Sequence, residues 1–121
     1  MKGIKSDLLI NLKDGYGVTM EELFYYQESP LKVYVVPKGY KTDFASIPSV
    51  FQPVFEKLGR HNNAAILHDY LYDHGYSKYK LTRKEADKIF LDEMQILGVS
   101  KIKRKSMYYA VRMFGGSRFI K

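Results

Sequence analysis

The sequence contains no cysteine and no tryptophan, only four prolines among its 121 residues, and no acidic residue after Glu93. Without cysteine the chain can form no disulfide, no thiolate zinc site and no cysteine nucleophile. This composition fits a reducing compartment. No apolar run approaches the roughly 18 residues that a membrane-spanning helix needs, and the N-terminal apolar run, Leu8 to Ile10, is too short for a signal peptide. We therefore expect neither a transmembrane segment nor a secretion signal.

The missing C-terminal acids explain the net charge of +7. Residues 1–99 hold 13 basic and 13 acidic side chains, whereas residues 100–121 hold seven basic side chains and no acid. A basic helix face with an interleaved tyrosine suits the phosphate backbone of a nucleic acid, an acidic protein or an anionic lipid surface. A solvated face on a core helix is the alternative. Residues 101–118 are therefore a candidate partner or polyanion surface, formed by Lys101, Arg104, Lys105, Tyr108 and Arg112.

The remaining composition is that of an ordinary globular protein, with 45% apolar and 27% charged residues. The length suits one domain over residues 1–121. Residues 1–45 are rich in strand patterns, and the clearest is the alternating, β-branched segment 31–36, which Pro37 and Gly39 end as a turn. Residues 46–116 have helical periodicity. The pattern predicts an α+β fold with a small N-terminal antiparallel meander followed by three to four helices.

Helix boundaries follow from capping residues. Residues 61–73 form one predicted helix, which Gly75 ends. Thr82 and Glu85 have the spacing of a capping box, so a second helix begins after Thr82. Gly98 ends that helix.

The last predicted helix begins at Ser100 and ends at Gly115-Gly116. A shorter helix is expected over residues 49–58. On the last helix the apolar side chains fall on one predicted inner face, made of Met107, Ala110, Val111 and Phe114.

The segment around His68 holds the residue types that carry chemistry. His68 and Tyr72 are four residues apart, so they share one face of a helix that is otherwise apolar, and Asp69 is adjacent. If the first and second helices form an antiparallel hairpin, the rise of about 1.5 Å per residue brings Asp87 nearly level with His68. The sequence therefore predicts that the side chains of His68 and Asp87 lie within about 6 Å of each other.

Two interpretations of this group stay open. In a catalytic site, His68 would be a base or metal ligand, Asp69 a ligand, and Asp87 an orienter or ligand, with Tyr72 in support. In a structural site, His68 would be a buried and hydrogen-bonded histidine. The cofactor is unknown from these residues, although His68 and Asp69 are of the types that bind a divalent metal.

Asp43 is a further candidate for this site. It lies in the polar segment 42–48 between the strands and the helices, where functional residues are often found. It can add a carboxylate to the His68 site, or it can satisfy loop amides and cap the next helix.

Together these segments resemble the DUF1353 family, a domain of unknown function met in bacteriophages and prophages. The resemblance spans roughly residues 31–116. It implies a phage origin, a place in the virion or the host cytoplasm, and a phage or host protein as partner, but no established activity. The segments that carry it are YVVPKGYKTDFASIP at 34–48, AAILHDYLY at 64–72, Arg83 with Ala86-Asp87, and YAVRMFGG at 109–116.

A second resemblance is local. His68-Asp69-x-x-Tyr72 is similar to the His-Asp-x-x-Tyr helix of phospholipases A2, in which the His is the base and the Asp binds calcium. There an aspartate on an antiparallel helix orients the His, a role that Asp87 could match. The chain lacks that family's glycine-rich calcium loop and its disulfides.

Three functions from different classes follow from these patterns. The first is a phage structural or accessory protein that binds another phage or host component, with the His68 group as a structural network. The second is a small metal-assisted hydrolase that uses His68, Asp69 and Asp87. The third is a nucleic-acid-binding module that uses residues 101–118.

Overall fold

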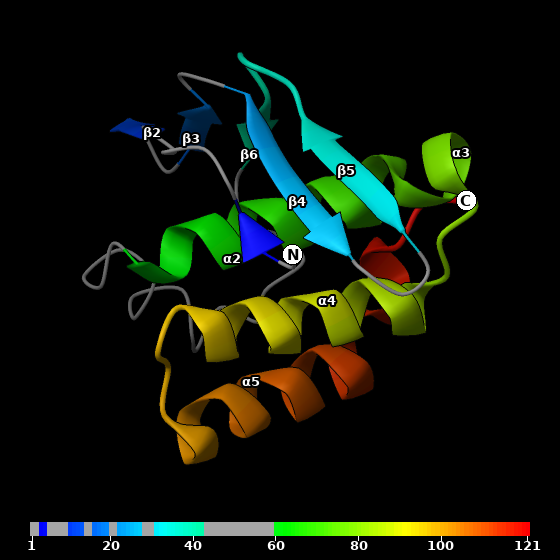
Figure 1. The fold of residues 1–121 in the computed structure, drawn as a ribbon. Helices are drawn as coiled ribbons and strands as arrows, with labels where there is room; N and C mark the ends of the chain where they lie inside the picture. Colours follow the sequence, from blue (N-terminus) through cyan, green and yellow to red (C-terminus); the bar gives the residue numbers. More distant parts are fainter. Residues whose placement is uncertain (1–2, 5–9, 14–15, 20–21, 28–30, 43–59) are drawn as a thin grey trace. The chain divides into compact units, whose positions relative to one another are not determined.

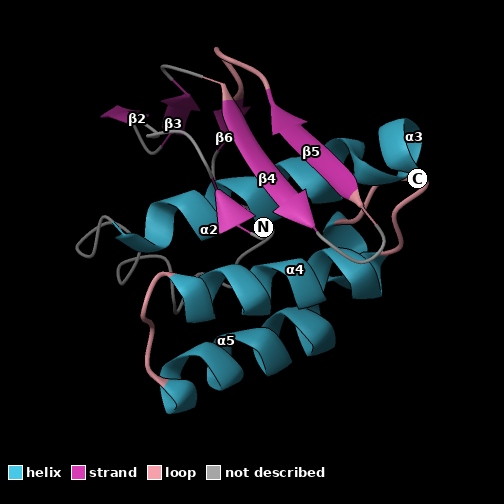
Figure 2. Cartoon of the chain, in the orientation of Figure 1, coloured by secondary structure: helices cyan, strands magenta, loops and turns pink. Residues whose placement is uncertain are grey.

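The computed structural model describes residues 3–4, 10–13, 16–19, 22–27, 31–42 and 60–121. The chain divides into two compact units, residues 1–43 and 44–121. Strands make up the described part of the first unit and helices that of the second (Figure 2). This order confirms the predicted α+β class. The helix predicted over residues 49–58 lies outside the described residues.

Two antiparallel sheets form the part of the first unit that the structure describes. The order of the first sheet is β1-β4-β5 and that of the second is β2-β3-β6. As a meander predicts, the sequence neighbours β2 and β3 pair, as do β4 and β5. The other two strands pair with non-neighbours: β1 with β4, and β6 with β3. The strands are β1 (Gly3–Ile4), β2 (Ile10–Lys13), β3 (Tyr16–Thr19), β4 (Leu23–Gln27), β5 (Lys32–Val36) and β6 (Lys41–Thr42).

The alternating pattern of β5 places its core residues. Tyr34 and Val36 are buried, and their partners across the pair with β4, Tyr25 and Leu23, are buried as well. Directly paired residues point to the same side of a sheet, so these four side chains form one apolar face. After β5 the predicted turn is present, because the Tyr40 N–H donates to the carbonyl of Pro37 and φ at Gly39 is +84°.

The described part of the second unit, residues 60–121, contains three longer helices joined by short segments. Figure 1 shows α2, α4 and α5 running alternately in opposite directions, with α4 in contact with both of the others. Thr82 and Glu85 make the predicted capping box, and Ser100 caps the last helix. The bounds are α2 (Arg60–Tyr70), a π-helical segment (Leu71–Gly75), α3 (Tyr76–Tyr79), α4 (Arg83–Ile96), α5 (Lys101–Phe114) and a 3₁₀ turn (Gly115–Arg118).

One predicted helix end is wrong. The chain does not leave the helix at Gly75 but stays helical to Tyr79, and Lys80 ends it with φ at +56°. Gly75 itself has right-handed helical angles. Its lack of a side chain serves packing, because a Cβ there would lie 3.1 Å from Cδ2 of Leu81. The absence of a side chain at Gly75 therefore lets the side chain of Leu81 pack close to this turn of the helix.

The predicted inner face of α5 is only partly buried: Ala110 is half-buried, and Phe114 departs most from the prediction. Met107 and Val111 are buried, whereas 66% of Phe114 is exposed. Phe114 is the last residue of α5, where the helix gives way to the 3₁₀ turn. Within the described residues, none of the helices is long and apolar enough to span a membrane.

Candidate functional site

Asp87, on α4, is the centre of a buried polar group. Nε2 of His68 lies 2.7 Å from its Oδ1, and the hydroxyl of Tyr72 donates to the same oxygen at 2.6 Å. All three side chains are fully buried. The distance predicted between His68 and Asp87 is therefore confirmed, because the helices that carry them pack against each other as the hairpin requires.

The other oxygen of Asp87 is bound by arginines. Nη1 of Arg112, on α5, donates to Oδ2 at 2.7 Å, and Nη1 of Arg83 lies 3.7 Å from it. Arg83 also donates to the carbonyls of Val111 and Arg112, at 3.1 and 3.2 Å. We call Asp87, His68, Tyr72, Arg83 and Arg112 the Asp87 network. It joins α2, α4, α5 and the π-helical segment through a single carboxylate.

Burial and the hydrogen bonds to Asp87 shift the pKa values of Asp87, Tyr72 and Arg112. Burial by itself would raise the pKa of Asp87, but hydrogen bonds from His68, Tyr72 and Arg112, with the attraction of His68, outweigh it and lower that pKa below its usual range. Burial and the bond to Asp87 raise the pKa of the Tyr72 hydroxyl above its ordinary value. The bond to Asp87 raises the pKa of Arg112. Asp87 is thus ionised and Tyr72 neutral near neutral pH.

The ionised state of Asp87 determines which nitrogen of His68 carries the bonding hydrogen. An ionised carboxylate only accepts hydrogen bonds, so Nε2 of His68 carries a hydrogen and donates it to Asp87. The arrangement has the parts of an oriented base, but the side chain of His68 is fully buried.

Close packing holds the rings of the network in place. The imidazole of His68 lies between the rings of Tyr72 and Phe90, with centroids at 4.2 and 4.6 Å. Gly115 approaches the hydroxyl of Tyr72 so closely that a Cβ there would lie 2.7 Å from the oxygen. The 3₁₀ turn after α5 therefore needs a glycine at this position.

The other candidates for a catalytic or metal-binding role, Asp69 and Asp43, are not part of the Asp87 network as described. Asp69 follows His68 on α2 and is buried, with 5% of its surface exposed. Asp43 lies outside the described residues. Within the described part of the chain, no group of three or more His, Cys, Asp or Glu side chains is arranged to hold a metal ion.

The basic face predicted on α5 is narrower than the sequence pattern indicates. Arg112 turns inward to Asp87, and Arg104 donates from Nη1 to the carbonyl of Val99. Tyr108 is only partly exposed, while Lys101 and Lys105 are exposed. Helical periodicity places a residue on a side of the helix, but a long arginine can reach from that side into the interior.

The comparisons with known proteins identify the family. Residues 18–111 match the family described as "Protein of unknown function (DUF1353)". The chain belongs to the DUF1353 family. It is also similar to the uncharacterized protein y4iH of Sinorhizobium fredii (strain NBRC 101917 / NGR234), with 38% identity over 80 residues. That match covers 64% of this chain and 32% of the relative, so the chain corresponds to about a third of its length. No solved structure matches the chain significantly.

The role of Arg112 in the site of this DUF1353 protein could not be found by sequence reasoning. Arg83 is four residues before Asp87, and this spacing on one helix is itself a signal for an ion pair. Arg112 is 25 residues away on another helix and looks like one of seven C-terminal cations. Its pairing depends on the packing of α5 against α4, for which the local sequence carries no marker.

Proposed function

We propose that this DUF1353 chain is an accessory protein that acts by binding another protein through the outer face of α5. The family resemblance to phage and prophage proteins makes a phage or host protein the proposed partner. The observation that carries the proposal is the exposure of apolar side chains on this helix: Ile102 is 84% exposed, Met113 74% and Tyr109 60%. Spacings of seven and four residues place the three on one side of α5.

The charge around these side chains indicates the chemistry of the partner. Lys101, Lys103 and Lys105 are exposed on the same helix, and residues 100–121 contain no acid. An apolar strip beside cations favours a partner with an apolar contact bordered by Asp and Glu. A second copy of the chain would bring like charges together, so we propose an acidic partner protein.

The buried polar group supports a binding function over catalysis. Its histidine, tyrosine and aspartate are fully buried, and both oxygens of the aspartate are already bonded within the protein. A hydrolase would need His68 in contact with substrate. In a binding protein the Asp87 network has a structural role: it bonds the inner side of α5 to α4 and leaves the outer side of α5 for a partner.

The nucleic-acid function has less support. Two of the predicted cations, Arg104 and Arg112, make hydrogen bonds within the protein. Because arginine is the side chain that best matches phosphate geometry, these internal bonds weaken the case for a phosphate-binding face. The exposed strip of Ile102, Tyr109 and Met113 suits a protein surface better than a phosphate backbone.

Site-specific crosslinking tests the proposal. A photoreactive phenylalanine analogue is placed at Ile102 and, in a second variant, at Met113, and the proteins are irradiated in extracts of phage-infected or lysogenic host cells. Leu31, an apolar residue outside α5 that is 78% exposed, is the control position. We expect both α5 positions, and not Leu31, to crosslink to the same protein within an acidic segment.

The purified partner then allows a quantitative test. Ile102→Asp and Met113→Asp should each weaken its binding by at least about tenfold, because each places a charge in an apolar contact. The melting temperature should stay unchanged, because both side chains are exposed. Adducts that form equally at Leu31, adducts with nucleic acid only, or unchanged affinity in both Asp variants would contradict the proposal.

A further inference from the structure

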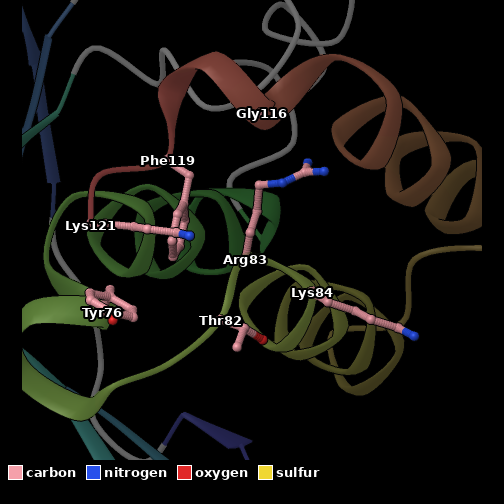
Figure 3. Close-up of a pocket in the computed structure, with 7 residues that line it drawn as sticks. All are labelled: Tyr76, Thr82, Arg83, Lys84, Gly116, Phe119 and Lys121. Carbon is pink, nitrogen blue, oxygen red and sulfur yellow. The ribbon is translucent and has the colours of Figure 1, made fainter.

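A cavity of about 620 Å³ lies in the helical unit, between α3, the start of α4 and the C-terminal segment. This volume is in the range of small-molecule sites. The start of α4 contributes Thr82, Arg83 and Lys84, α3 contributes Tyr76, and the C-terminal segment contributes Gly116, Phe119 and Lys121. Figure 3 shows these residues on different elements, with the side chain of Arg83 pointing toward Gly116 and that of Lys84 extending away from Phe119 and Lys121.

The lining is positively charged. Among the described residues that line it, Arg83, Lys84 and Lys121 are cationic and none is acidic. The ammonium of Lys80 lies over the ring of Tyr76, 5.2 Å from its centroid, and adds a fourth cation beside the wall. The nearby Glu85 does not line the cavity, and its carboxylate accepts from the main-chain nitrogen and the hydroxyl of Thr82, both at 3.0 Å. The cavity therefore presents cations to whatever enters it.

Hydrogen bonds within the protein fix the position of the Arg83 guanidinium. Its Nη1 is bonded to two carbonyls at the end of α5 and lies 3.7 Å from Asp87. A guanidinium has five N–H donors, so these bonds leave donors on its other nitrogens. A fixed guanidinium loses little side-chain freedom on binding, which favours affinity.

The opposite wall is also fixed in place. The Ile120 N–H donates to the carbonyl of Tyr72 at 2.9 Å, and the ring of Phe119 packs edge-on against that of Tyr72, with centroids 5.4 Å apart. These contacts hold the C-terminal segment, which carries Lys121, against the π-helical segment. The rings of Phe119 and Tyr76 give the cavity an apolar part beside its cations.

We propose that this cavity binds a small molecule that carries a diphosphate or triphosphate group. A phosphate monoester carries about −1.5 to −2 charges at neutral pH, so linked phosphates neutralise several clustered cations in a small volume. Arginine binds phosphate oxygens in pairs, and lysine is a common phosphate ligand. The two sources of such a group are a nucleotide, whose base would contact Phe119 or Tyr76, and inorganic pyrophosphate or triphosphate.

Isothermal titration calorimetry of the full chain with pyrophosphate, ADP, ATP, AMP and adenosine tests this proposal. Pyrophosphate, ADP and ATP should bind with micromolar to low millimolar Kd, AMP more weakly, and adenosine not at all. Affinity should fall as NaCl is raised, because the contacts are ionic. Absence of binding by pyrophosphate, ADP and ATP at millimolar concentration overturns the proposal.

Matched charge reversals locate the binding. Lys121→Glu should weaken pyrophosphate binding by at least about tenfold. Lys105→Glu makes the same charge change at an exposed residue of α5 that does not line the cavity, and it should change Kd by less than about twofold. If Lys121→Glu does not fold, Lys84→Glu takes its place. An equal loss in Lys105→Glu and the cavity variant overturns the proposal, because binding would then follow net charge alone.

Binding of ADP and pyrophosphate to the Phe119→Ala variant distinguishes a nucleotide ligand from an inorganic one. For a nucleotide ligand, ADP binds more tightly than pyrophosphate, and Phe119→Ala weakens ADP while leaving pyrophosphate unchanged. For an inorganic ligand, ADP and pyrophosphate bind equally and Phe119→Ala changes neither. Either result supports a phosphate site in this cavity.

Discussion

Arg112 and His68 hold opposite oxygens of Asp87: Nη1 of Arg112 lies 2.7 Å from Oδ2, and Nε2 of His68 lies 2.7 Å from Oδ1. One carboxylate on α4 thereby connects α2 with α5, two helices that approach it from different directions. Because Asp87 is fully buried, its charge depends on these partners in place of water. The stability of the helical unit should therefore depend strongly on this one side chain.

Removing the charge of Asp87 tests this dependence. Asp87→Asn removes the anionic partner of Arg112, whose side chain is 28% exposed, and the charged acceptor of His68 and Tyr72. It should cost at least about 1.5–3 kcal/mol, the contribution of one hydrogen bond to a charged group. Asp92→Asn is the matched control on the same helix, since Asp92 pairs with the exposed Lys88 and such surface pairs contribute about 0–1 kcal/mol. Urea unfolding measures both. Equal losses in the two variants would show that Asp87 has no special structural role.

The pH dependence of stability should contain a contribution from Asp87. Its pKa is lower in the folded state than in the unfolded chain, where aspartate titrates near about 3.9. The folded protein then binds fewer protons, so this contribution is fully present above about pH 5 and is lost as the pH falls through the folded pKa. The difference in unfolding free energy between wild type and Asp87→Asn, measured from pH 7 down to pH 3, should shrink below about pH 4. A difference that grows on acidification contradicts the assigned direction.

Gly115 and Tyr72 should be coupled in stability. Gly115→Ala places a Cβ 2.7 Å from the Tyr72 hydroxyl and should destabilise by about 1–3 kcal/mol through overpacking. Tyr72→Phe alone should cost about 1.5–3 kcal/mol, since it removes a hydrogen bond to a charged acceptor. In the Tyr72→Phe background the closest clash is absent, so Gly115→Ala should cost less than it does in the wild type.

A double-mutant cycle by chemical unfolding measures this coupling. Gly116→Ala is the control, because among the described residues a Cβ at Gly116 would meet only Cζ of Arg83, at 3.9 Å. It should change stability by less than about 0.5 kcal/mol. Additive effects of Tyr72→Phe and Gly115→Ala would mean that the 3₁₀ turn adjusts freely to the larger side chain.

Two apolar residues of α5 should respond differently to truncation. Met107 is fully buried, so Met107→Ala should cost about 2–5 kcal/mol. Phe114 is 66% exposed, and Phe114→Ala should cost less than about 1 kcal/mol despite the larger side chain. Thermal unfolding of the two variants is the measurement. A greater loss for Phe114→Ala would place it in the core, as the helical pattern alone predicts.

The elements of this protein that could be predicted are those encoded by neighbouring residues. The capping box of Thr82 and Glu85 and the cap at Ser100 depend on contacts within a few residues, and the strand 32–36 is marked by its own alternating, β-branched pattern. The pairing of His68 with Asp87 was also predictable, because helix rise and a short connection place them level. Gly75 shows the limit of such patterns, since a glycine that permits close packing has the same local signature as one that ends a helix.

The sequence by itself determined the α+β order, the helix starts, and the candidate group of His68, Tyr72 and Asp87, because spacing along a helix or strand decides which side chains share a face. Only the tertiary structure decided that Arg112 turns inward to Asp87 and that Phe114 faces outward. It also decided that Arg83, Lys84 and Lys121 line one cavity. These last relationships join residues up to 38 positions apart. They arise from how α4, α5 and the C-terminal segment pack together, and no periodicity within a single element specifies that packing.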